Sequence, residues 1–346
     1  MSVFESNIQD EALNLRPPSL DINPLKIFDI AKAECRPLYA AAPMVRYSKL
    51  AFRETVALYG VDLTWTPMML AKEFNRSAMA RDSDFTTSPH APPTIAQFGC
   101  NSPLEISRAT TMIAPHVNGI DLNCGCPQSW ACAETLGAAL MHKRELVASM
   151  VSSAKSTLES LGLADKKTVS IKIRVHKDLR ETVDFVRTVQ EAGVDFITIH
   201  GRMRSTPSSQ PVNHDAIKLV AEHITIPKLS NGDVFTLSDA KEHAKFTGVD
   251  GVMSARGLLE NPALFRGYEN CPWEAVETFM ERVIRAPLPF KLVVHHFGEM
   301  GGSDRSQRGK TLFRKEERAK LMACEDMMEL IDWFQEMKEQ KQRGVG

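Results

Sequence analysis

Two cysteines separated by one glycine, Cys124 and Cys126, stand near the middle of the chain and are followed by Pro127. A zinc site needs three or four ligands, and no histidine accompanies these two and Cys132, so we expect no metal here. The C-x-C spacing also differs from the C-x-x-C spacing of redox disulfides. A single working thiol beside a structural cysteine fits best. A free thiol, with a pKa of about 8.5, is mainly protonated at neutral pH and can donate a proton.

A lysine lies in a strongly apolar setting further along. Lys172 alternates with Ile171 and Ile173 and is expected to point into the interior, where a cation is costly unless it meets an anion. A flavin ring, whose reduced form is negative near N1 and O2, would supply that anion. The alternative is a lysine on a half-exposed edge strand. Gln97 and His200 could bond the same ring edge or substrate carbonyls, although either alone is more often structural.

Two glycine-containing turns have the chemistry of a phosphate site. Asn231-Gly232-Asp233 and Ala255-Arg256-Gly257 follow the last two predicted strands, where barrel proteins commonly bind phosphate. The glycines allow backbone N–H groups to approach an anion closely, and Arg256 adds a fork of donors. The alternative is a pair of ordinary turns with a surface arginine.

The elements that position these residues follow a repeated pattern. A glycine-type helix stop leads into a short β-branched run at Gly60, Asn118, Gly193 and Gly248. Four more apolar runs begin at Pro37, Thr94, Thr168 and Ile226, which gives eight strand candidates. Helix-period segments lie between them, over residues 49–59, 105–113, 146–161, 180–191, 214–223 and 237–245.

Eight strands alternating with helices predict an α/β protein with a (β/α)₈ TIM barrel. A doubly wound open sheet is the rival, but it would require a Gly-rich first turn. After the barrel we expect helices over 273–283, 312–328 and 330–341, broken by Pro287, Pro289 and Gly301–Gly302. The predicted domains are an N-terminal extension (1–36), the barrel (37–268) and a small all-helical C-terminal domain (269–346).

Composition narrows the class of protein. The chain has 346 residues, 43% of them hydrophobic, and a net charge of −1, so a polyanion would have to meet a local basic patch. Seven cysteines are too few for a disulfide scaffold and indicate a reducing compartment. The N-terminus lacks the pattern of a signal peptide, and no apolar run reaches the ~20 residues of a membrane helix. We expect a cytoplasmic protein, possibly also nuclear, with no membrane association.

Taken together and in order, six motifs resemble the tRNA-dihydrouridine synthase family over about residues 37–265. The motifs are residues 43–53, 123–128, 171–174, 200–202, 231–233 and 255–257. The first two are similar to the eukaryotic subgroup that acts on positions 20a and 20b of the tRNA D-loop. The resemblance implies an FMN-binding barrel, a C-terminal helical domain that helps to bind tRNA, and NADPH or NADH as a transient electron donor; no obligatory protein partner is evident.

The resemblance also assigns roles to residues. It implies that Cys126 is the catalytic proton donor and that Asn123, Arg174 and Arg202 contact the substrate. Around FMN it implies Pro43, Met44, Val45, Gln97, Lys172, His200, Asn231, Gly232, Asp233, Ala255 and Arg256. Phosphate contacts to tRNA could come from the basic C-terminal segment, with Arg305, Arg308, Lys310, Arg314 and Lys315 as candidates, although a solvated helix face is an equal alternative.

The implied reaction is reduction of uracil, with hydride delivered to C6 from the flavin and a proton to C5 from Cys126. The uridine must leave the RNA stack to reach a barrel mouth, which costs a few kcal/mol. Two alternatives remain open: an FMN-dependent reductase of a free small molecule, and a tRNA-binding protein without activity.

Overall fold

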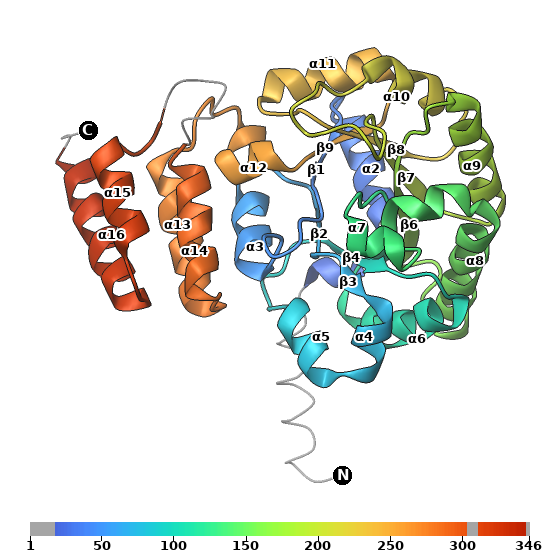
Figure 1. Ribbon diagram of the computed structural model, residues 1–346, viewed down its shortest axis with the longest axis horizontal. Coiled ribbons are helices and arrows are strands. Elements are labelled where there is room, and N and C mark those ends of the chain that lie inside the picture. The colour runs from blue at the N-terminus through green and yellow to red at the C-terminus, as the bar shows by residue number, and fades with distance from the viewer. Residues whose placement is uncertain (1–17, 303–310, 344–346) are drawn as a thin grey trace, which may run out of the picture.

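Eight parallel strands close into a barrel in the computed structural model, which describes residues 18–302 and 311–343 (Figure 1). Neighbours pair in chain order, and the pairing of β2 with β4 closes the ring. The strands are β1 (Leu38–Ala41), β2 (Leu63–Trp65), β4 (Thr94–Gly99), β5 (Gly119–Cys124), β6 (Thr168–Arg174), β7 (Phe196–His200), β8 (Lys228–Asn231) and β9 (Gly251–Ser254). The TIM barrel and all eight predicted strands are confirmed.

The register of the strands stacks polar residues in two layers near their carboxyl ends. Gln97, Asp121 and Ser170 are aligned on β4, β5 and β6. One layer higher, Asn123 is aligned with Lys172 on the neighbouring strand. Gln97, Asn123 and Lys172 all lie within their strands, near the carboxyl ends.

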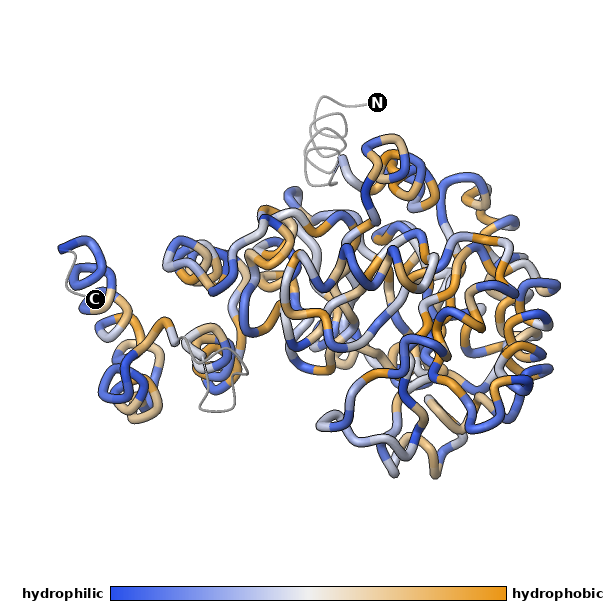
Figure 2. The backbone as a smooth tube through the Cα atoms, turned by 90° about the horizontal axis from the view of Figure 1, so that it is seen from above, coloured by the Kyte–Doolittle hydropathy of each residue, from blue (hydrophilic) through white to orange (hydrophobic). Residues whose placement is uncertain are grey.

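Six helices predicted from periodicity form the outer ring. They are α3 (Leu50–Leu58), α6 (Pro103–Ile113), α8 (Arg144–Ser160), α9 (Leu179–Glu191), α10 (His214–Ala221) and α11 (Leu237–Thr247). Ser102, Asn213 and Thr236 cap α6, α10 and α11 by accepting a backbone N–H. Figure 2 shows hydrophobic and hydrophilic residues alternating along these helices, in keeping with one face packed on the strands.

Shorter elements decorate the mouth of the barrel. A two-residue strand, β3 (Met69–Leu70), pairs with the end of β4 and leads into α4 (Ala71–Arg76) and α5 (Ala78–Asp84). The Cys126 loop runs into α7 (Ser129–Ala133) and the 3-10 helix η3 (Gly137–His142), and α12 (Arg256–Glu260) follows β9. Further 3-10 turns are η1 (Pro18–Asp21), η2 (Ala114–His116) and η4 (Leu264–Arg266). None of these short elements was predicted from the sequence.

Helix α2 (Pro24–Ala33) packs against the amino-terminal end of the barrel. Its buried Ile27, Phe28 and Ala31 join a core cluster with interior residues of the strands, among them Trp65 and Phe196. The Phe28 and Phe196 rings lie 5.5 Å apart. The sequence carried a signal that we did not use: Asn23 caps a helix that has Pro24 at its first position.

Four helices follow the barrel: α13 (Trp273–Arg285), α14 (Phe290–Met300), α15 (Lys315–Ala323) and α16 (Met327–Gln342). Helix α13 packs against α3, and in Figure 1 all four helices lie on the α3 side of the barrel, with α15 and α16 farthest out. The helical C-terminal region is confirmed, but α14 was missed. The single helix predicted over 312–328 is wrong, because Asp326 accepts N–H groups at the start of α16 and begins a new helix there. The predicted domain boundaries stay predictions.

Among the described residues, no helix is both long and apolar enough to cross a membrane.

Candidate active site

The loop that carries Cys126 is held from both sides by polar side chains. Asn123 Oδ1 accepts the backbone N–H of Gly125 at 3.0 Å and of Cys126 at 2.8 Å. From β6, Arg174 donates to the carbonyl of Gly125 at 2.8 Å. From η3, Ala138 N–H donates to the carbonyl of Cys126 at 2.9 Å. The thiol is therefore presented by a fixed backbone.

Glycine at position 137 is required by this loop. Gly137 has a φ of +59°, and a Cβ there would lie 2.6 Å from the carbonyl oxygen of Cys126 and 2.7 Å from its Cβ. Both the backbone conformation and the space exclude a side chain. The close approach of η3 to the cysteine depends on this residue, which the sequence analysis did not single out.

Burial raises the pKa of the Cys126 thiol, and the nearby cations Arg174 and Lys172 oppose that shift only weakly. A thiol with a raised pKa stays protonated at neutral pH, which is the state required of a proton donor. All seven cysteines are free, and Cys124, directly before the loop, is fully buried. The arrangement matches one accessible thiol beside a structural cysteine.

Lys172 lies inside the barrel near its mouth. Its Nζ donates to Asn231 Oδ1 at 2.8 Å, and Asn231 in turn donates to the carbonyl of Met253. Burial, helped by the positive charge of Arg174, lowers the pKa of Lys172 to about 7. The charge of Asp121 acts in the opposite direction. This cation lacks a full anionic partner in the described structure.

His200, the last residue of β7, is surrounded by positive charge. Burial, followed by the charges of Lys172, Arg174, Arg202 and Arg256, holds its pKa far below the usual range, so the ring is neutral. Its Nε2 lies 3.3 Å from Nη1 of Arg202, which can only donate, and the ring proton is therefore on Nδ1.

The two predicted phosphate turns line one small cavity of about 100 Å³, together with His200 and Arg202. A Cβ on Gly257 would collide with the carbonyl oxygen of Val234, and Gly232 has a φ of +132°. Both positions therefore exclude a side chain, and the backbone itself forms the wall of the cavity. The structure brings together Arg174, His200, Asn231, Gly232, Asp233, Ala255 and Arg256 at this place.

Asp233 binds the arginines of this cavity. It accepts from Arg202 at 2.6 Å, from Arg256 at 2.7 Å and from the N–H of Val212 at 2.9 Å. Arg202 is 4% exposed and also donates to the carbonyl of Gln210. Its guanidinium therefore supports the loop before α10 in this structure, and its predicted contact with substrate stays a prediction.

These residues fit a flavin mononucleotide. An excess of cations around a neutral histidine, with glycine backbone at the wall, suits a phosphate, and Lys172 suits the negative edge of a reduced ring. Pro43 and Met44 are half-buried and Val45 is exposed in the loop after β1, at the same end of the barrel. Gln97 lies deeper, with its amide nitrogen bound to Asp121 and its oxygen to Asn123.

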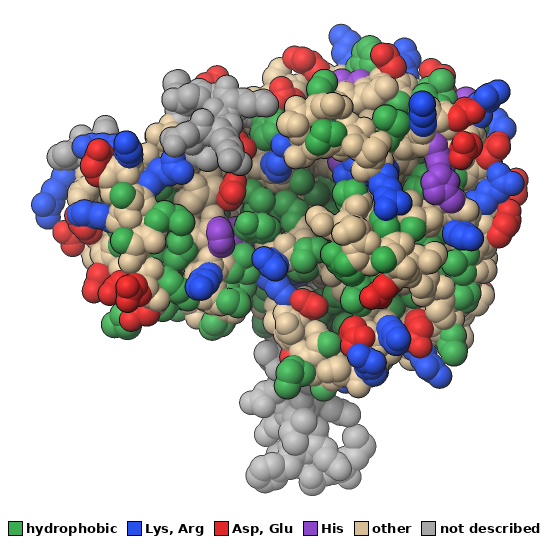
Figure 3. All heavy atoms as spheres, in the orientation of Figure 1, with side chains coloured by type: hydrophobic (Ala, Val, Ile, Leu, Met, Phe, Trp, Pro, Cys, Tyr) green, Lys and Arg blue, Asp and Glu red, His purple; other side chains and the backbone are tan. Residues whose placement is uncertain are grey.

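A groove of about 620 Å³ lies between the loop after β1 and the link from α13 to α14. Arg46, Lys49, Lys291 and His295 line it beside apolar residues that include Leu288. Figure 3 shows hydrophobic side chains gathered in the hollow between the helical region and the barrel, with basic side chains near its edge. Of the basic C-terminal candidates, Arg305, Arg308 and Lys310 lie outside the described residues, and Arg314 and Lys315 stand at the start of α15.

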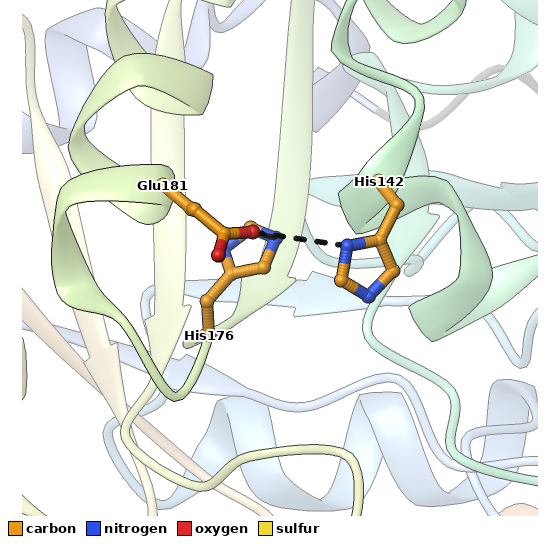
Figure 4. Close-up of side chains that lie close together, drawn as sticks. All are labelled: His142, His176 and Glu181. Carbon is orange, nitrogen blue, oxygen red and sulfur yellow. Dashed lines mark ion pairs between the residues drawn. The ribbon is translucent and has the colours of Figure 1, made fainter.

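A separate cluster contains His142 from η3, His176 from the segment after β6, and Glu181 from α9 (Figure 4). Each histidine has a nitrogen 3.9 Å from a Glu181 oxygen. The Nε2 of His176 lies 2.9 Å from the carbonyl of Met141, so it carries the ring proton and donates it there. In this state the ring has no lone pair facing the other two residues. Through the hydrogen bond from His176 to Met141, the cluster holds η3 against the segment after β6.

The chain belongs to the dihydrouridine synthase (Dus) family, whose model matches residues 40–344. It is 43% identical over 317 residues to the tRNA-dihydrouridine(20a/20b) synthase [NAD(P)+] of Saccharomyces cerevisiae, covering 90% of this chain and 83% of that protein. The protein of the same name from Schizosaccharomyces pombe is 43% identical, with 91% of each chain covered. A human protein named as similar to this synthase is 44% identical over 79% of this chain and 84% of its own length.

Proposed function

We propose that this chain reduces the C5=C6 bond of uridines at positions 20a and 20b of the tRNA D-loop, with FMN as its cofactor and NADPH or NADH as the electron source. The relatives carry this substrate in their names. The observation that best supports the chemistry is the position of Cys126, a thiol whose pKa burial raises, on a hydrogen-bonded loop in the same barrel mouth as Lys172 and the cationic cavity.

When bound, FMN would supply the hydride for C6 of uracil. The chain supplies the rest: Cys126 holds the proton for C5, while Asn123 and Arg174 fix the loop that carries it. Lys172 would stabilise negative charge on the reduced ring, and the cavity around Arg256 would hold the phosphate. Uridine gains one hydride and one proton, and NAD(P)H is oxidised to NAD(P)+.

The groove beside α14 would bind the tRNA near the flipped uridine. Arg46 and Lys291 can neutralise backbone phosphates, which would offset the cost of turning out the base, whereas Lys49 in the same groove is paired with Asp84. A reductase of free small molecules would not require this groove, and gel shift with unmodified tRNA separates the two functions.

The decisive experiment compares Cys126→Ala with Cys324→Ala, a cysteine in the helical region. Both proteins should be purified with yellow flavin, and NADPH should bleach both. Cys126→Ala should lose dihydrouridine formation on unmodified tRNA, while Cys324→Ala retains it. Normal turnover by Cys126→Ala would remove the proton-donor role, and a colourless native protein would favour the inactive tRNA-binding alternative.

A further inference from the structure

Four polar groups form a continuous chain from the barrel interior to the Cys126 loop. The Asp121 carboxylate accepts from Ser170 Oγ at 2.7 Å and from Gln97 Nε2 at 2.7 Å. Gln97 Oε1 accepts from Asn123 Nδ2 at 2.8 Å. Asn123 Oδ1 then accepts the two loop N–H groups. Asp121, Gln97 and Ser170 are at most 1% exposed, so water does not compete for them.

Asp121, at the interior end of this chain of hydrogen bonds, determines which way the Gln97 amide faces. A carboxylate only accepts, so the amide nitrogen of Gln97 must face Asp121 and its oxygen must face Asn123. The amide nitrogen of Asn123 must then face Gln97, which leaves its oxygen for the loop. If Gln97 turned over, its oxygen would face the carboxylate and its NH₂ would face the NH₂ of Asn123.

The amide groups cannot set this direction themselves, because their nitrogen and oxygen ends have the same shape. At the loop end, the backbone N–H groups of Gly125 and Cys126 both donate to Asn123 Oδ1, which orients the Asn123 amide. At the interior end, the acceptor-only carboxylate of Asp121 orients the Gln97 amide, so that Gln97 Oε1 is left to hold Asn123. The burial of this carboxylate is costly: desolvation raises the pKa of Asp121 to about 6, although Gln97, Ser170 and Lys172 all favour the charged form.

We propose that Asp121 is a positioning residue for the reaction: through Gln97 and Asn123 it fixes the backbone that presents the Cys126 thiol to the base. This inference rests on the proposed function, since it assigns Asp121 a role only in the step that uses the proton of Cys126.

The first test separates the hydrogen bonds from the charge. In Asp121→Asn the new amide oxygen can accept from Gln97 and its nitrogen can donate to Ser170, so the variant permits the same direction without enforcing it. In Asp121→Leu, a replacement of similar size, nothing accepts from Gln97. Flavin reduction by NADPH and reoxidation of the reduced flavin by unmodified tRNA should be measured separately by stopped flow.

We expect both variants to reduce flavin within about threefold of the wild-type rate. Reoxidation by tRNA should slow by roughly 100-fold in Asp121→Leu, on the order of the contribution of a general acid, and by less than about tenfold in Asp121→Asn. The affinity for tRNA should stay unchanged in both. Equal slowing of both half-reactions, or unchanged reoxidation in Asp121→Leu, would overturn the proposal.

The second test exchanges the two groups and does not depend on whether Asp121→Leu folds. Gln97→Glu places two carboxylates in contact, so its reoxidation rate should drop and should recover at lower pH, where the pair shares a proton. In the double variant Asp121→Asn, Gln97→Glu the amide at position 121 donates to the carboxylate at 97, which still accepts from Asn123. The reoxidation rate of this double variant should be at least tenfold higher than that of Gln97→Glu.

A double variant no faster than Gln97→Glu would refute the positioning role. Cys126→Ala in the same assay keeps the two ideas distinct. If Cys126→Ala reoxidises normally, the proposed chemistry of the thiol fails. If Cys126→Ala is slow and the Asp121 and Gln97 variants are not, only the positioning role fails.

Discussion

The ion pair at the base of the phosphate cavity gives a stability prediction of definite size. Asp233 accepts from Arg202, which is 4% exposed, from Arg256 and from Val212 N–H. Breaking a buried ion pair costs about 3–5 kcal/mol. Arg202 keeps its bond to the carbonyl of Gln210, and the carboxylate is a quarter exposed, so we expect about 3 kcal/mol for its loss.

The backbone conformation at Asp233 makes the expected loss of stability differ between the possible substitutions. Asp233 has a φ of +50°, where alanine adds about 1 kcal/mol of strain, while asparagine and glycine add little. Asp233→Ala should therefore lose about 4 kcal/mol of unfolding free energy and Asp233→Gly about 3. Asp233→Asn, which keeps an acceptor for Val212, should lose about 1.5.

The assay is urea unfolding of the FMN-free protein followed by circular dichroism. Glu73→Gln is the control, because it removes an ion pair with Arg76 that is exposed on both sides and should change the free energy of unfolding by less than about 1 kcal/mol. The loss of unfolding free energy should decrease in the order Asp233→Ala, Asp233→Gly, Asp233→Asn, and another order would refute the role given to the backbone. An Asp233→Asn variant as stable as Glu73→Gln would refute the role given to the ion pair.

Three further predictions concern the active site. Gly137→Ala should cut dihydrouridine formation more than about tenfold with flavin retained, whereas Gly162→Ala, at a φ of +67° with nothing within 4 Å of a Cβ, should lose only stability. Binding of reduced FMN at pH 7 should take up about half a proton, because the pKa of Lys172 is about 7 and the negative edge of the reduced ring raises it. Anaerobic calorimetry in buffers of different ionisation enthalpy measures this uptake, and Lys172→Met should abolish it. Since the folded state binds the Asp121 proton more tightly than the unfolded chain, with a pKa of about 6, the free energy of unfolding should fall by about 2 kcal/mol from pH 4 to 6 relative to Asp121→Asn, as urea titrations at each pH would show.

Local sequence patterns predicted the barrel because each strand is a short apolar run that follows a helix stop. They failed where tertiary contacts decide. Helix α14 lies between Pro289 and Gly301, two residues that suggested a break, yet its buried Val293 and Phe297 give it a core to pack on. The break before α16 depends on the capping side chain of Asp326.

The site shows the same division. The residues at the strand ends could be predicted, because parallel strands bring their carboxyl ends to one face. The chain from Asp121 through Gln97 to Asn123 could not, since it depends on the register between β4, β5 and β6. One signal was present: Asp121 is a charge between Ile120 and Leu122 in a buried strand, and such a charge must have partners.

Helix α2 has a consequence for the order of events. With Phe28 packed against Phe196, helix α2 covers the amino-terminal end of the barrel. Substrates can therefore approach the flavin only from the carboxyl-terminal end of the strands. On the proposed function, NAD(P)H and tRNA use the same opening and must bind there one after the other. Initial-rate plots at several fixed concentrations of the second substrate should then give parallel lines.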